Sequence, residues 1–128
     1  MLIACAPPHG SADVDLKAKL VGSWRFEYKD EFERAVQGTV RLSDDGKFFA
    51  VEMVNGEQGF RESRLSGPWY VTEGLFKLNT QVEDGKALGS LQQSFFTCKV
   101  AEFSAMKFDC SDELAKKTYT YTRVSSAS

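Results

Sequence analysis

The chain has 128 residues, of which 42% are hydrophobic and 27% are charged, and its formal net charge is −2. This length and composition are typical of one globular domain, which we expect to be monomeric. The balanced charge argues against a nucleic-acid partner, because no basic surface is available to collect phosphates. No apolar run approaches the roughly 20 residues that a membrane-spanning helix needs.

The first residues resemble a processing signal. Leu2-Ile3-Ala4-Cys5 is followed by a short stretch rich in small residues and proline. This pattern is similar to the end of a bacterial lipoprotein signal peptide, in which the cysteine of the lipobox receives a lipid. The resemblance implies that Cys5 is lipidated, that residues 1–12 are a lipobox remnant and flexible tether, and that a domain over 13–128 is anchored on the periplasmic side of the bacterial cell envelope. The alternative is a cysteine that follows small and aliphatic residues by chance.

A short helix and a first strand are predicted to open the domain. Asp13 is placed to cap a helix that ends at Gly22, because the apolar residues between them share one face. The apolar residues then alternate with polar ones, which is typical of a strand with one buried and one solvent-exposed face. Its predicted inward residues are Trp24, Phe26 and Tyr28.

The middle of the chain predicts hairpins. Asp44-Asp45-Gly46 supplies residues that accept a positive φ between two alternating stretches. Further turns are predicted at Asn55-Gly56, Ser66-Gly67-Pro68, Glu73-Gly74 and Glu83-Asp84-Gly85. In the strands between these turns, we expect the inward residues to be Val40, Leu42, Phe49, Val51, Met53, Trp69 and Val71.

Three more strands are predicted in the last third of the chain. Their alternating residues centre on Cys98, Phe108 and Tyr121. The total is eight or nine short strands, with turn signals at the spacing expected of an all-β sandwich or barrel.

Cys98 and Cys110 are predicted to form a disulfide across two neighbouring strands. With a turn centred near Ser104 they would lie directly opposite each other, and Lys99 would face Asp109. The alternative is two free thiols that pack as small hydrophobic groups. A metal site is not predicted, because neither cysteine has a second ligand at zinc-finger spacing.

Two ends of the domain together suggest a family. Gly22-Ser23-Trp24 opens the first strand after a short helix, and Arg123 stands near the end of the last strand. Over about residues 16–124 the chain resembles the lipocalin-like, or calycin, barrels, and most of all the small bacterial lipocalin-like lipoproteins. The resemblance implies an all-β fold, a single antiparallel up-and-down β-barrel of 8–9 strands with a short N-terminal helix. It also implies that Arg123 packs over Trp24 at the closed end of the barrel.

The function expected of such a barrel is the binding of a small hydrophobic or amphipathic ligand, for example a fatty acid, in its interior. The alternative is that the interior residues only pack against one another, and that the domain is a protein–protein module acting through rim loops at 30–34 and 83–90. The predicted ligand-binding residues are Phe26, Tyr28, Leu42, Phe49, Val51, Met53, Trp69, Phe96, Tyr119 and Tyr121.

An enzyme is not expected. The one histidine, His9, falls in the predicted tether, so no histidine-based triad can be assembled in the barrel. The acidic pairs Asp44-Asp45 and Glu83-Asp84 occupy turns, where hydrogen bonding to the local backbone explains them. The sequence has no glycine-rich phosphate loop, and we expect no cofactor.

Overall fold

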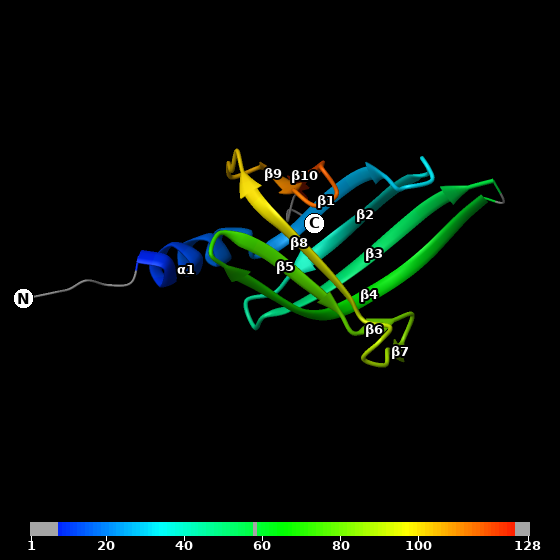
Figure 1. Ribbon diagram of the computed structural model, residues 1–128, viewed down its shortest axis with the longest axis horizontal. Coiled ribbons are helices and arrows are strands. Elements are labelled where there is room, and N and C mark those ends of the chain that lie inside the picture. The colour runs from blue at the N-terminus through cyan, green and yellow to red at the C-terminus, as the bar shows by residue number, and fades with distance from the viewer. Residues whose placement is uncertain (1–7, 58, 125–128) are drawn as a thin grey trace, which may run out of the picture.

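The chain forms an antiparallel sheet that closes on itself, with one helix at its end (Figure 1). The computed structural model describes residues 8–57 and 59–124. The elements in chain order are α1 (Pro8–Leu20), β1 (Gly22–Lys29), β2 (Ala35–Leu42), β3 (Lys47–Gly56), β4 (Gly59–Thr72), β5 (Leu75–Thr80), β6 (Val82–Glu83), β7 (Lys86–Ala87), β8 (Ser94–Ala101), β9 (Lys107–Asp112) and β10 (Lys117–Arg123).

Neighbours along the chain pair in the wall of the barrel. The pairing runs from β1 through β2, β3, β4, β5, β8 and β9 to β10, which pairs back with β1. Closure leaves no free sheet edge in this wall. β6 and β7 form a small hairpin beside it that pairs with β4. The predicted all-β, antiparallel up-and-down barrel with a short N-terminal helix is therefore confirmed, with eight strands in the wall.

The long strand β4 corrects two predicted turns. It runs unbroken through Ser66-Gly67-Pro68, and the connection between β3 and β4 comes after Asn55-Gly56 rather than at it. One edge of β4 pairs with β3 up to Pro68. The other edge pairs with β6 at Leu65 and Ser66 and with β5 from Trp69 onward, so the partner on this second edge changes at Gly67 and Pro68. The missing N–H of a proline is tolerated where the partner changes. Gly67 is also needed there, because a β-carbon would collide with the backbone of Asn79.

The helix is longer than predicted and is held differently. It begins at Pro8, so Asp13 lies within it and does not cap its start. The Asp13 carboxylate instead accepts hydrogen bonds from the backbone N–H groups of Glu73 and Gly74, at 2.8 and 2.9 Å. Cys5 lies outside the described residues. No helix in the described part of the chain is long and apolar enough to cross a membrane.

The end of the barrel next to α1 is closed by two tryptophans. Trp24 on β1 is fully buried and donates a hydrogen bond from Nε1 to the Leu20 carbonyl at 2.8 Å. The Arg123 guanidinium lies 4.1 Å from the centre of its ring, as the sequence predicts. Trp69 on β4 donates to the Ser43 carbonyl at 2.8 Å. This end of the barrel is tied to the helix through Trp24.

The predicted disulfide is present, but its register is not the predicted one. Cys98 and Cys110 are bonded, with their Cα atoms 5.3 Å apart. Val100, not Cys98, is the direct partner of Cys110, and Lys99 faces Ser111 rather than Asp109. The turn is centred beyond Ser104, since the Ser104 N–H donates to the Lys107 carbonyl at 2.8 Å. The disulfide therefore runs diagonally between β8 and β9.

Candidate functional site

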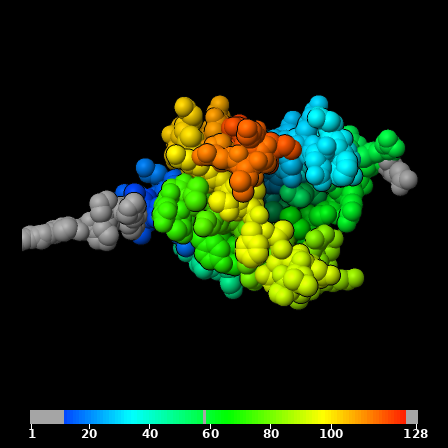
Figure 2. All heavy atoms as spheres, in the orientation of Figure 1, coloured from blue at the N-terminus to red at the C-terminus, as the bar shows by residue number. Residues whose placement is uncertain are grey.

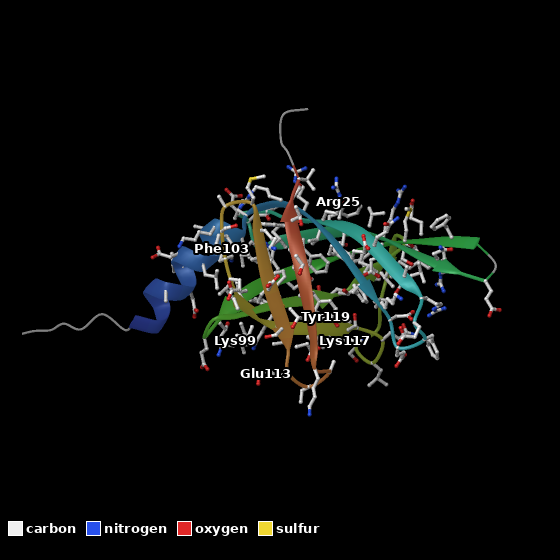
Figure 3. All side chains as sticks on the ribbon, turned by 90° about the horizontal axis from the view of Figure 1, so that it is seen from above. Arg25, Lys99, Phe103, Glu113, Lys117 and Tyr119 are labelled. Carbon is white, nitrogen blue, oxygen red and sulfur yellow. A yellow bond between two sulfur atoms is a disulfide. The ribbon has the colours of Figure 1, made fainter. Side chains whose placement is uncertain are left out.

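The half of the barrel away from α1 contains a cavity of about 280 Å³. Every strand of the wall except β9 contributes to its lining. The lining residues are Phe26, Tyr28, Val40, Phe48, Ala50, Glu52, Leu65, Leu78, Thr80, Ser94, Phe96, Tyr119 and Tyr121. Tyr119, labelled in Figure 3, comes from β10. Five predicted ligand-binding residues, Phe26, Tyr28, Phe96, Tyr119 and Tyr121, thus meet at this cavity.

The half next to α1 is filled by side chains. Trp24 and Phe108 pack edge to face with ring centres 4.7 Å apart, and both are fully buried. Phe103, which Figure 3 shows near the helix end of the barrel, also packs on Trp24. Leu42 and Trp69 are each 1% exposed and belong to this core. These two predicted ligand-binding residues point inward but do not reach the cavity.

Strand β3 presents the opposite face from the one predicted. Phe49 is 49% exposed on the outside, while Phe48 is 3% exposed and faces inward. Phe48 pairs directly with the inward residue Leu42, and the alternation then brings Ala50 and Glu52 inside. Val51 and Met53 line a shallow depression on the outer surface instead. The predicted inward placement of Phe49, Val51 and Met53 is therefore wrong.

The reason for this error is that β3 is apolar on both faces. Phe49, Val51 and Met53 form the more uniformly apolar row, whereas the true inward row contains Glu52. A carboxylate is tolerated inside because the cavity opens to solvent and the Tyr28 hydroxyl lies within hydrogen-bonding reach of it. The signal that would have identified Phe48, Ala50 and Glu52 is their register across the β2–β3 turn.

Glu52 has the only ionisable carboxyl group in the lining. Burial raises its pKa above the ordinary value, and the nearby negative charge of Glu83 raises it further, while its hydrogen bond with Tyr28 acts in the opposite direction.

Gly38 is the partner of both Glu52 and Phe26 across β2. A β-carbon at Gly38 would lie 2.7 Å from the Phe26 ring, so the glycine leaves room for that ring inside the barrel.

The tyrosines of the cavity are held in their neutral form. Burial is the main cause of a raised pKa at Tyr28, Tyr119 and Tyr121, and the Glu52 carboxylate adds to it at Tyr28 and Tyr121. Tyr28 and Tyr119 pack edge to face at 5.1 Å, and Tyr119 packs on Phe96 at 5.3 Å. The site therefore combines neutral aromatic rings with one carboxyl group.

A groove of about 650 Å³ lies at the open end of the barrel. We call it the mouth groove; it is lined by Phe32, Arg34, Val54, Gly56, Glu57, Gly59, Arg61, Ser63 and Glu83. Figure 2 shows a recess there, between the residues after β1 in cyan and the β6–β7 hairpin in yellow-green. Val54 follows Glu52 in the inward row of β3, so the mouth groove leads toward the cavity.

The β1–β2 loop at one side of the mouth groove is held by several hydrogen bonds. The Asp30 carboxylate accepts hydrogen bonds from the N–H groups of Phe32 and Arg34, and pairs with Arg34 Nε at 2.8 Å. Although desolvation acts to raise the pKa of Asp30, these hydrogen bonds lower it overall. Phe32 is 69% exposed on this loop. The loop thus holds one apolar ring at the rim.

The cavity lining offers groups for noncovalent contact with a small molecule. Among residues 8–57 and 59–124, no cluster of three or more His, Cys, Asp or Glu side chains could hold a metal ion. The cavity instead provides rings for apolar contact, tyrosine hydroxyls for hydrogen bonds and a single carboxyl group. Sites for small molecules commonly consist of such an apolar wall with few polar groups.

Comparisons with known proteins identify no family, so the fold is the main guide to function. No model of a known protein family matches the chain, and a search of curated proteins found no match either. The closed eight-stranded antiparallel barrel is consistent with a calycin-like fold. A barrel of this kind is compatible with ligand binding.

Proposed function

We propose that this protein binds a small apolar or amphipathic molecule in the cavity of its barrel. The observation that carries the proposal is the contrast between the two halves of the interior. The half beside α1 is densely packed, whereas the open half leaves about 280 Å³ among aromatic rings. This is the space of roughly nine molecules of liquid water at about 30 Å³ each. It suits a ligand smaller than most drugs.

We propose a binding role without catalysis. A serine or threonine hydroxyl is a weak nucleophile unless an adjacent base or another group activates it. Glu52 is accompanied in the cavity lining by neutral tyrosines, serine and threonine, and the lining residues include no histidine, lysine or cysteine. A lone carboxyl group in an aromatic cavity is better suited to recognising a ligand than to converting it.

We also propose that the domain is a monomer attached to the bacterial cell envelope, on the periplasmic side, through a lipid on Cys5. The sequence Leu2-Ile3-Ala4-Cys5 supports the attachment. The disulfide between Cys98 and Cys110 fits the same proposal, because such bonds persist in oxidising compartments.

A matched pair of variants on β8 tests the binding proposal. Ser94 lines the cavity and Thr97 lies on the outer face of the same strand. The neutral dye N-phenyl-1-naphthylamine becomes fluorescent in apolar surroundings. We expect saturable enhancement with the wild type and with Thr97→Trp, and a loss of at least tenfold in affinity with Ser94→Trp. Equal dye binding by the two variants would place the dye elsewhere and overturn the proposal.

A second candidate function is a protein–protein module that acts through the rim. It is favoured by two exposed rings near the mouth groove, Phe32 at 69% and Phe60 at 68% exposure. Exposed aromatic side chains are common at protein interfaces. If the dye and other small molecules fail to saturate the wild type, while Phe32→Ser abolishes capture of a protein partner, this second function replaces the first.

A further inference from the structure

We propose that the ligand is a monovalent organic cation, a protonated amine on a small apolar or aromatic body, whose ammonium group pairs with Glu52. This inference rests on the proposed function of the cavity and specifies the class of molecule that it accepts. Three features of the lining support it: the sign of its charge, the arrangement of its rings and the position of its carboxyl group.

The cavity lining contains one carboxyl group and no basic side chain. Apart from the tyrosines, whose pKa values burial raises further above their ordinary value near 10, Glu52 is the single acidic or basic residue among the lining side chains. A buried charge gains most when it is paired with one of opposite sign, because water screens it poorly. An ammonium group would provide that pairing, whereas a carboxylate would add a second negative charge next to the first.

The rings around Glu52 favour a cation as well. Tyr28 contacts Glu52 and packs edge to face on Tyr119, which packs in turn on Phe96. Phe26 and Tyr121 pack on each other with ring centres 5.8 Å apart and continue the aromatic lining. The faces of such rings attract an ammonium group, and the attraction grows when the group is removed from water.

The arginines of the mouth groove do not convert the cavity into an anion site. Arg34 is paired with Asp30 at 2.8 Å, and Arg61 lies in the mouth groove together with Glu57 and Glu83. Neither arginine belongs to the lining of the cavity. A fatty acid inserted with its tail inward would hold its carboxylate near Arg61, but also near Glu52 and Glu83, where like charges repel it.

The position of Glu52 sets the orientation of the ligand. Along the inward row of β3, Phe48 is deeply buried, Glu52 is half-buried, and Val54 already belongs to the mouth groove. The ammonium group would therefore sit in the outer part of the cavity, and the apolar body would extend toward Phe48 and Tyr121. An amine with its charge at one end and its apolar body at the other fits this arrangement.

A series of three similar molecules tests the charge preference directly. The probes are 2-phenylethylamine, the neutral 2-phenylethanol and the anionic phenylacetate, titrated into the wild-type protein by isothermal calorimetry at pH 7.5. We expect the amine to bind at least tenfold more tightly than the alcohol, and phenylacetate to bind most weakly. Tighter binding of the alcohol or of phenylacetate than of the amine would overturn the inference.

Glu52→Gln removes the charge and retains the shape of the side chain. We expect it to weaken binding of the amine at least tenfold and to leave binding of 2-phenylethanol within threefold of the wild type. Glu62→Gln is the matched control, because Glu62 pairs with Met53 on the outer face of β4; it should bind all three probes like the wild type. If Glu52→Gln does not fold, the ranking of the three probes on the wild type decides alone.

The outcomes separate this inference from the function on which it rests. If the protein binds N-phenyl-1-naphthylamine but does not prefer the amine among the three probes, the cavity binds apolar molecules and the inference of a cationic ligand is wrong. If neither the dye nor any of the three probes saturates, the proposed function fails together with the inference. An amine preference that survives in Glu52→Gln would show that Glu52 does not recognise the charge.

Discussion

Arg123 and Trp24 are direct partners across β10 and β1, and the guanidinium of Arg123 lies 4.1 Å from the centre of the Trp24 ring. The same guanidinium donates hydrogen bonds to the carbonyl groups of Lys19 and Val21, at 2.9 and 3.2 Å, and to that of Ala105 at 2.7 Å. One side chain therefore joins the last strand, the first strand, the end of the helix and the β8–β9 loop. The carbonyls of Lys19 and Val21 lie at the C-terminal end of α1, where carbonyl groups have no donor within the helix, so a cation is favoured there.

Removal of this guanidinium should destabilise the fold. We expect Arg123→Met to lower the free energy of unfolding by about 3 kcal/mol, because it loses a cation–π contact and charged hydrogen bonds. Arg123→Lys should lie between this variant and the wild type, since a lysine keeps the charge but not the planar fork. Urea unfolding monitored by circular dichroism measures this change in the free energy of unfolding.

The control for Arg123 is Arg25→Met, because Arg25 is exposed and lies on the outer face of β1. Its unfolding free energy should stay within about 0.5 kcal/mol of the wild type, as for most surface substitutions. If Arg123→Met and Arg25→Met were equally stable, the contact with Trp24 would contribute little to the fold.

The half-buried carboxyl group of Glu52 makes stability depend on pH. Because the pKa of Glu52 is raised in the folded protein, the folded state binds a proton at Glu52 more tightly than the unfolded chain does. This contribution to stability is complete below the unfolded pKa of about 4.3 and is lost as the pH rises through the folded pKa. Glu52→Gln should therefore match the wild type at pH 4 and become increasingly more stable than it toward pH 8.

Urea unfolding at several values of pH between 4 and 8 measures this difference. Glu62→Gln, which removes an exposed carboxylate on the outer face of β4, serves again as the control and should follow the wild type across the series. A Glu52→Gln variant that is less stable than the wild type at pH 8 would mean that the carboxylate is better paired inside than its surroundings indicate.

The disulfide should stabilise the barrel by restricting the unfolded chain. Cys98 and Cys110 are 12 residues apart, and closing a loop of this size contributes about 3 kcal/mol. We expect Cys98→Ala/Cys110→Ala to unfold at correspondingly lower urea. A reductant should shift the wild type in the same direction and leave the double variant unchanged. A wild type that is indifferent to the reductant would contradict the bond.

Lipidation of Cys5 can be tested apart from the barrel. When the chain is expressed in a bacterium behind a complete lipoprotein leader, the wild type should partition into detergent and carry the added mass of acyl chains, each methylene contributing about 0.8 kcal/mol of membrane affinity. Cys5→Ser should partition into water and retain its binding of N-phenyl-1-naphthylamine. Equal partitioning of the two proteins would argue for a cysteine without a lipid.

Where one face of a strand is clearly polar, the sequence predicts the fold correctly. Arg25 and Glu27 alternate with the buried Trp24 and Phe26 on β1, and threonines alternate with tyrosines on β10. This contrast specifies which side faces inward, because a slip of one residue would bury charges. The same patterns predict Phe26, Tyr28, Phe96, Tyr119 and Tyr121, all of which line the cavity.

The predictions fail where that contrast is missing or where contacts are distant. On β3 both faces are apolar, so the pattern does not distinguish Phe49 from Phe48 and does not indicate that Glu52 faces inward. The register between β8 and β9 depends on the position of the turn near Ser104. The residue types in that loop do not determine the position of the turn. The hydrogen bonds from Glu73 and Gly74 to Asp13 join segments 60 and 61 residues apart, and no local pattern indicates them.

The seam between β1 and β10 has a consequence for how the chain folds. Val21 and Arg123, which are hydrogen-bonded at this seam, are 102 residues apart, so the seam cannot form until nearly every other strand is available. Until β10 docks, the outer edges of β1 and β9 expose unpaired N–H and C=O groups, which readily pair with other chains. Slow folding is typical of such distant pairings. A chain that stops before Lys117 should therefore aggregate, even though it retains the helix and most of the strands.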